Sequence, residues 1–204
     1  MNLSGQDAIE RALSLLAAAL EAGDVAPVSL VIIGGAAMNV LGLRIRPTKD
    51  VDVLAIRGPA SESSEIVLLK HKPLPEPLVR AAEQVAEALD LDPGWLNAGP
   101  ADLLDWGLPE GFERRLTERT YGPRLTVLLP AREDLVCLKV YAAADTGPGR
   151  HTEDLRALHP TRDEILSGVR WARTQDPSEG FRSMVTALLA YLDVDVAEGD
   201  IDGS

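Results

Sequence analysis

Two apolar runs joined by a short polar bridge constrain the fold of this chain more than any other feature of its sequence. The run "VSLVII" ends at Gly34-Gly35, and the run "VDVLAI" follows after a stretch that contains arginine, lysine and threonine. Apolar runs that are rich in β-branched residues and bounded by glycine or polar residues are typical of buried strands. We therefore predict strands over 27–34 and 50–56, with a short helix over 36–43 between them.

The remaining periodic stretches predict helices at both ends of the chain and a hairpin near its middle. The predicted helices cover 5–22, 75–91, 131–145, 151–158, 161–175 and 179–193, and the predicted hairpin covers 116–130. This order favours an α/β (α+β) fold, in which helices flank a mixed sheet and the C-terminal part is helical. We place the core at 1–130, a helical part of the same compact unit at 131–195, and an acidic tail at 196–204.

Composition limits the class of partner. The 204 residues carry a net charge of −12, so the chain as a whole repels polyanions, and a nucleic acid would need a local basic patch. Cys137 is the one cysteine, which excludes a disulfide within the chain. The sequence also lacks a basic leader and a long apolar run, so we expect a cytoplasmic protein with no membrane segment.

Asp50 and Asp52 lie two positions apart at the start of the second predicted strand. Side chains alternate along a strand, so both carboxylates are expected on one face, with their Cα atoms about 6–7 Å apart. Two carboxylates so close repel each other unless a cation lies between them. Mg²⁺ is held in proteins by one or two carboxylates together with substrate phosphates. The pair therefore predicts a site for Mg²⁺ or Mn²⁺.

The other half of this stretch predicts a place for phosphates. Gly34 and Gly35 lie at a strand-to-helix junction, where missing side chains let a ligand approach the backbone and where the helix start attracts anions. Arg46 and Lys49 add positive charge, and Thr48 adds a hydroxyl. A glycine pair alone is most often just a tight turn, and only its combination with the aspartates predicts a site for a nucleoside triphosphate (NTP) bridged by metal.

The stretch "GGAAMNVLGLRIRPTKDVDV" resembles the nucleotidyltransferase superfamily with the DNA polymerase β-like fold. It is most similar to the AbiEii/MenT type of nucleotidyltransferase-like proteins, which are often toxins of toxin–antitoxin pairs. The later segment "EDLVCLKVYAAADTGPGRHTEDLRAL" is similar to a helical pattern of that group. The resemblance implies a catalytic or phosphate-binding role for Lys139 and nucleotide-binding roles for Arg150 and Asp154. The residues alone also allow a structural role for each of them. Lys139 could extend its ammonium group to solvent, and Arg150 and Asp154 could form an i,i+4 pair on one helix.

The resemblance also implies a third carboxylate, which acts on the acceptor hydroxyl. Its expected position is beside Asn97-Ala98, where this sequence has no acidic residue. Three alternatives remain open: Asp102 substitutes from the next turn, Glu118 comes in from the hairpin, or the third group is absent.

Three functions follow from these expectations. The first is Mg²⁺-dependent transfer of a nucleotide from an NTP to a tRNA 3′ end or a protein hydroxyl, as a possible toxin with a cognate antitoxin. The second is a nucleotide-binding or regulatory protein that keeps the fold and has weakened transfer chemistry. The third is a small-molecule transferase of the aminoglycoside-modifying type, because an acidic cleft suits a cationic acceptor.

Overall fold

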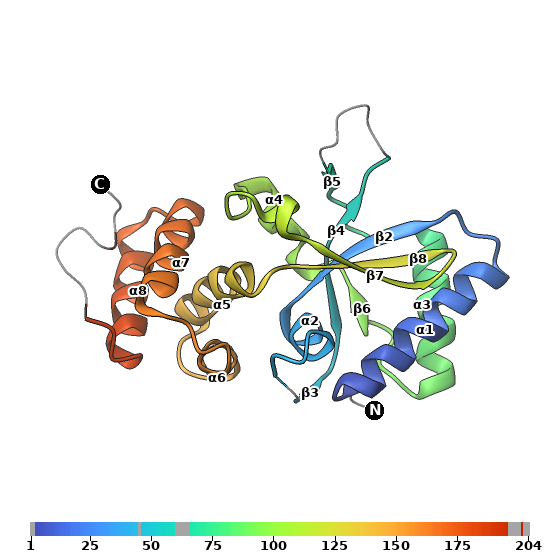
Figure 1. Ribbon diagram of the computed structural model, residues 1–204, viewed down its shortest axis with the longest axis horizontal. Helices are drawn as coiled ribbons and strands as arrows, with labels where there is room; N and C mark the ends of the chain where they lie inside the picture. Colours follow the sequence, from blue (N-terminus) through green and yellow to red (C-terminus); the bar gives the residue numbers. More distant parts are fainter. Residues whose placement is uncertain (1–2, 45, 60–65, 196–200, 202–204) are drawn as a thin grey trace. The chain divides into compact units, whose positions relative to one another are not determined.

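The computed structural model describes residues 3–44, 46–59, 66–195 and 201. Most of the predicted acidic tail, and part of the polar loop after the second strand, lie outside the described residues. Contacts divide the chain into two compact units, Met1–Ala131 and Arg132–Ser204 (Figure 1). Each unit is described by itself.

The first unit is built on a mixed sheet with the strand order β5-β4-β2-β8-β7, in which β6 also pairs with β4. β2 is antiparallel to β4 and parallel to β8, and β7 and β8 form the predicted hairpin. The strands are β2 (Val28–Ile33), β4 (Val51–Arg57), β5 (Leu68–Leu69), β6 (Leu96–Asn97), β7 (Thr117–Gly122) and β8 (Leu125–Leu129). A separate antiparallel pair joins β1 (Leu3–Ser4) to β3 (Pro47–Thr48).

Helices cover this sheet. α1 packs against α3 and contacts β7 and β8, whereas α2 contacts β2 and β4 (Figure 1). The helices of the unit are α1 (Gln6–Ala22), α2 (Gly34–Val40), α3 (Glu76–Leu89), α4 (Leu103–Trp106) and the short 3₁₀ helices η1 (Gly99–Asp102) and η2 (Phe112–Arg115). All residues of 30–33 and 53–56 are buried. Since adjacent strand residues point to opposite faces, both faces of the central strands are covered.

The ends of α1 and α2 differ from their predicted positions. The helix predicted over 5–22 begins at Gln6 with its N-cap at Gly5, because the preceding residue, Ser4, belongs to β1 and pairs with Pro47. The helix predicted over 36–43 begins two residues earlier, at Gly34, and ends at Val40. The chain turns away soon afterwards at Gly42, whose φ of +68° lies in the left-handed region that glycine tolerates.

The second unit is helical. It consists of α5 (Arg132–Thr146), α6 (Arg150–Ala157), α7 (Arg162–Gln175) and α8 (Glu179–Tyr191), and α5 contacts the other three. Tyr141 of α5 packs edge-on against Trp171, with ring centroids 6.1 Å apart, and lies 5.5 Å from the ring of Phe181. At Gly168 an added Cβ would lie 3.0 Å from Val140, so glycine allows α7 to approach α5 closely.

The predicted architecture is confirmed: a mixed sheet is flanked by helices and followed by a helical C-terminal part. Each predicted helix and strand is present, with ends that differ by at most a few residues. In the part of the chain that the structure describes, no helix combines the length and the apolarity needed to cross a bilayer.

Candidate functional site

The antiparallel pairing of β2 and β4 brings the glycine pair to the aspartates. β2 runs into Gly34-Gly35, and β4 begins at Val51, directly after Asp50. In the register of the two strands Ile33 pairs with Asp52. The end of β2 and the start of β4 therefore meet at one edge of the sheet, where both predicted halves of the site lie.

The closest approach at this edge joins Gly34 to Asp52. Gly34 has a φ of +70°, and a Cβ added to it would lie 2.8 Å from Oδ2 of Asp52. No side chain fits in that space, and the backbone conformation is itself one that glycine adopts at low cost. The carboxylate of Asp52 thus lies directly against bare backbone.

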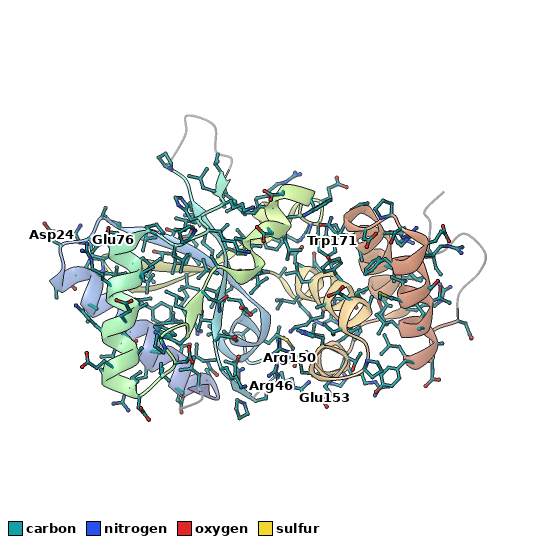
Figure 2. The ribbon with its side chains drawn as sticks, turned by 180° about the vertical axis from the view of Figure 1, so that it is seen from behind. Asp24, Arg46, Glu76, Arg150, Glu153 and Trp171 are labelled. Carbon is teal, nitrogen blue, oxygen red and sulfur yellow. The ribbon has the colours of Figure 1, made fainter. Side chains whose placement is uncertain are left out.

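Arg46 and Thr48 face the second glycine. A Cβ added to Gly35 would lie 3.1 Å from Nη2 of Arg46 and 3.4 Å from Oγ1 of Thr48. Figure 2 shows Arg46 beside the ribbon of α2. The Thr48 hydroxyl donates to the backbone carbonyl of Asp50 at 3.2 Å and lies 3.4 Å from Oδ1 of the Asp50 carboxylate. Both carboxylates are therefore connected to the glycine pair, Asp52 directly and Asp50 through Thr48.

Asn39 holds this arrangement together, although it was not among the residues predicted from the sequence. Its side chain is fully buried, and its amide donates to the carbonyl oxygens of Gly35 at 2.8 Å and Arg46 at 3.1 Å. Its Oδ1 accepts from the Arg46 N–H at 3.2 Å. The two bonds with Arg46 tie its backbone to α2, and the bond to Gly35 lies within that helix. The signal in the sequence was a polar residue inside the apolar stretch one turn after Gly35.

Lys49 and Asp50 lie in the connection between β3 and β4. Lys49 is exposed and Asp50 is half-buried. The predicted strand included Asp50, whereas β4 begins one residue later. The ammonium group of Lys49 is therefore solvent-exposed. Lys49 is a neighbour of the aspartates in sequence, but its side chain is not packed into the site.

Asn97 occupies the position beside Asp52. β6 pairs with β4 in parallel, and their register matches Asp52 to Asn97. The side-chain amide of Asn97 donates to Oδ1 of Asp52 at 3.3 Å. An amide therefore stands next to Asp52 at the position where the family resemblance implied a third carboxylate.

The two other candidates for that carboxylate bind cations of their own. Asp102 forms salt bridges with Lys70, at 2.8 Å, and with Lys72. Hydrogen bonds from these two ammonium groups, that of Lys70 first, lower the pKa of Asp102 to about 2. Glu118 pairs at 2.5 Å with Arg57, the last residue of β4, whereas Asp52 lies near the start of that strand.

The remaining predicted residues belong to the second unit. Nζ of Lys139 in α5 lies 2.7 Å from Oδ2 of Asp154 in α6, and both residues are buried, at 4% and 0% exposure. Within this unit the pair is an internal ion pair that joins two helices. Arg150 is exposed at the start of α6, and its Nε donates to Nε2 of His151 at 3.2 Å. Contacts of these three residues with a nucleotide stay predictions.

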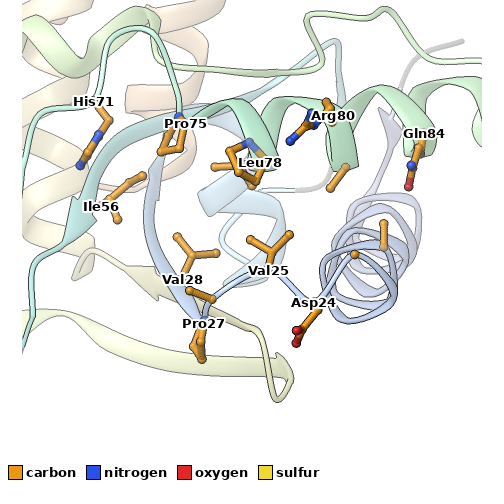
Figure 3. Close-up of a pocket in the computed structure, with 15 residues that line it drawn as sticks. Asp24, Val25, Pro27, Val28, Ile56, His71, Pro75, Leu78, Arg80 and Gln84 are labelled. Carbon is orange, nitrogen blue, oxygen red and sulfur yellow. The ribbon is translucent and has the colours of Figure 1, made fainter.

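A cavity of about 690 Å³ lies at the other end of the central strands (Figure 3). Apolar residues such as Val28, at the start of β2, and Ile56, near the end of β4, line it. The charged side chains of Asp24 and Arg80 at its edge form salt bridges with Arg124 and Glu76. The cavity is therefore separate from the edge that carries the glycines and aspartates.

Comparisons with known proteins supply little beyond this geometry. No protein-family model and no curated protein matches the sequence. Among solved structures, the chain is similar to an antigenic nucleotidyltransferase-like protein from Paracoccidioides brasiliensis, with 14% identity, full coverage of both chains and a TM-score of 0.48. A similarity this slight supports no conclusion about function.

Proposed function

We propose that this chain is a nucleotidyltransferase, which binds an NTP with a divalent cation at the edge formed by β2 and β4. The observation that carries the proposal is the contact of bare backbone at Gly34 with the Asp52 carboxylate, 2.8 Å from where a Cβ would lie. A glycine in the left-handed region beside a carboxylate, with a guanidinium over the next residue, fits a phosphate and its counter-ion better than it fits a simple turn.

The donor set suits Mg²⁺ or Mn²⁺. Asp50 and Asp52 offer carboxylate oxygens, which these hard cations prefer, and phosphate oxygens of the substrate would complete the coordination. Among the described residues there is no group of three or more histidine, cysteine, aspartate or glutamate side chains arranged for a metal. When bound, the cation would neutralise charge on the α-phosphate and the departing pyrophosphate.

The chain's own residues would position the triphosphate. The glycine pair leaves room for phosphate oxygens against the backbone, and Arg46 offers a planar fork of N–H donors that matches them. The Asn39 bonds to the Arg46 backbone hold the start of that side chain in place before substrate arrives. Preorganisation of this kind supports binding because less conformational entropy is lost when the ligand is ordered.

In the transfer step, the oxygen of an acceptor hydroxyl would form a bond to the α-phosphorus. The bond from that phosphorus to the oxygen leading to the β-phosphate would break, pyrophosphate would leave, and the hydroxyl proton would pass to water. The acceptor would be a tRNA 3′ end or a protein hydroxyl. That acceptor class and the AbiEii/MenT toxin role with its antitoxin rest on the sequence resemblance, whereas the proposed cytoplasmic location rests on the composition of the chain.

One observation favours a second candidate, a protein that binds the NTP without efficient transfer. The amide of Asn97 stands beside Asp52 and donates to it, so it cannot accept the proton of an attacking hydroxyl. Loss of a positioned general base typically lowers a rate by about 10²–10⁴-fold. Nucleotide binding would survive this loss.

Labelled NTPs distinguish the two candidates. Each α-labelled NTP is incubated with Mg²⁺ or Mn²⁺, total RNA and cell protein, and NTP binding is measured in parallel by calorimetry. Asp52→Asn removes the site carboxylate, and Asp163→Asn, at a side chain 95% exposed in the second unit, is the control for the charge change. We expect label in an acceptor with wild type and Asp163→Asn only. Binding without label would support the second candidate, and no binding of any NTP would exclude both.

A further inference from the structure

We infer that Asn97 limits the site to a single divalent cation for each bound nucleotide, because its amide faces Asp52 as a hydrogen-bond donor and takes the place of a metal ligand. The inference rests on the proposed function and deepens it. It concerns the number of cations, and it is decided by the orientation of one side chain.

The orientation of the amide follows from its second partner. The backbone N–H of Gly99 donates to Oδ1 of Asn97 at 2.8 Å. An N–H group is only a donor, so the atom that faces Gly99 must be the carbonyl oxygen and not the NH₂ group. A Cβ added to Gly99 would lie 2.9 Å from that oxygen, so the approach depends on glycine.

With Oδ1 turned to Gly99, the NH₂ group of Asn97 is left facing Asp52. It donates to Oδ1 of Asp52 at 3.3 Å, and the strand register holds the two residues side by side. The NH₂ group has no lone pair to offer a cation, and its hydrogens carry partial positive charge. Asn97 therefore directs Oδ1 of Asp52 towards itself, while Oδ2 lies against Gly34. A second cation beside Oδ1 would meet a donor where it requires an acceptor.

Replacing the amide of Asn97 by a carboxylate turns the group that faces Asp52 from a hydrogen-bond donor into a possible metal ligand. In Asn97→Asp one carboxylate oxygen still accepts from the Gly99 N–H, and the other faces Asp52. Two carboxylates in this register repel each other unless a cation joins them. The variant therefore gains the oxygen ligands that a second cation needs.

The test counts Mn²⁺ ions. Protein is mixed with a non-hydrolysable NTP analogue and Mn²⁺, free Mn²⁺ is measured by electron paramagnetic resonance, and bound nucleotide is measured by equilibrium dialysis. We expect one Mn²⁺ for each nucleotide in wild type and two in Asn97→Asp, with broadening of the bound signal from coupling between the two ions.

The chain offers a matched control. Asp92 accepts from the Gly94 N–H at 2.8 Å, in the same local turn that Asn97 makes with Gly99. Asp92→Asn replaces a carboxylate by an amide at that turn, the reverse of Asn97→Asp. This variant should still bind one Mn²⁺ for each nucleotide. If the number of Mn²⁺ ions bound for each nucleotide changed in Asp92→Asn, an exchange of carboxylate and amide in such a turn would alter cation binding indirectly. That result would overturn the inference.

The outcomes separate this inference from the proposed function. Two Mn²⁺ for each nucleotide in wild type would overturn the inference and leave the proposed function standing, and that measurement needs no variant to fold. One Mn²⁺ in a folded Asn97→Asp would also overturn it. Failure of wild type to bind the analogue with Mn²⁺ would overturn the proposed function itself.

Discussion

At the scale of single residues, the candidate site depends on a glycine, which has no side chain, and on a fully buried asparagine. Gly34 keeps its carboxylate neighbour in place by having no Cβ, and Asn39 uses a completely buried amide to connect two backbone segments. Buried polar groups are costly unless they are hydrogen-bonded, so each such residue has a measurable consequence when it is replaced.

Gly34→Ala should abolish NTP binding and lower the free energy of unfolding. The left-handed φ alone costs a non-glycine residue about 1–2 kcal/mol, and the added Cβ would collide with Oδ2 of Asp52. Gly42→Ala is the control, since Gly42 has nearly the same φ, +68°, with nothing within 4 Å of the added Cβ. Calorimetric titration with an NTP and urea denaturation measure the two effects. Equal NTP affinity in both variants would contradict the role of Gly34 in the site.

Asn39→Ala should lower the free energy of unfolding by about 2–3 kcal/mol, because the buried carbonyl of Gly35 and the partly buried backbone groups of Arg46 lose their partner. Hydrogen exchange of the amide of Arg46 should also become faster. Thr186→Ala removes an exposed hydroxyl bond to the Arg182 carbonyl and should cost less than about 0.5 kcal/mol. If the two variants were equally stable in urea denaturation, Asn39 would have no bracing role.

At the scale of elements, side chains couple the helices of the second unit. Glu164, in the first turn of α7, accepts two N–H groups of the Arg132 guanidinium from α5, one of them at 3.1 Å. It also accepts from the Thr161 N–H at 2.7 Å, while the Thr161 hydroxyl accepts from the Glu164 N–H at 3.2 Å. This reciprocal pair is a capping box, and it starts α7 at the same place where the helix contacts Arg132.

Acid should weaken the link between α5 and α7. The Arg132 guanidinium, followed by the Thr161 N–H, lowers the pKa of Glu164 to about 2 from its ordinary value of 4.5. A carboxylate with a lowered pKa stabilises the folded state above its unfolded pKa and loses that effect as protonation occurs. The stability advantage of wild type over Glu164→Gln should therefore be complete above about pH 4.5 and vanish as the pH falls to about 2.

Urea denaturation at a series of pH values measures this advantage. Glu179→Gln, at the start of α8, is the control, because it makes the same charge change and leaves the Arg132 contact intact. An advantage that stayed constant between pH 5 and pH 2 would show that the pKa of Glu164 is not lowered.

At the scale of the whole molecule, the net charge limits the class of acceptor. The net charge of −12 repels polyanions at long range, and this repulsion is screened by salt. An RNA acceptor must then be recognised through local contacts made after a weak encounter.

The chain should therefore pass through a heparin column at low salt without retention, and its affinity for random RNA should rise, rather than fall, as salt is added from low concentration. Lysozyme, a basic protein, is the positive control for the column. Retention of this chain at low salt would show that a basic patch outweighs its net charge.

Local chemistry in the sequence was sufficient to predict the longer helices and strands. The period of apolar residues in α1 and the β-branched run in β2 act within a few residues of each other, so they are visible without the fold. The same holds for Gly34-Gly35 and for the Asp-x-Asp at the start of β4, of which only Asp52 belongs to the strand, because backbone freedom and charge repulsion are properties of neighbouring residues.

Pairings between distant residues required the tertiary structure. Nothing local in Leu96-Asn97 predicts that β6 pairs with β4, nor that Asn97 faces Asp52, and the burial of Lys139 against Asp154 depends on how α6 packs on α5. The sequence by itself determined the longer helices and strands, and it placed the glycine pair and the two aspartates in one short stretch of the chain. The tertiary structure alone decided strand register and the partner of each polar side chain, because these depend on packing between segments far apart in the chain.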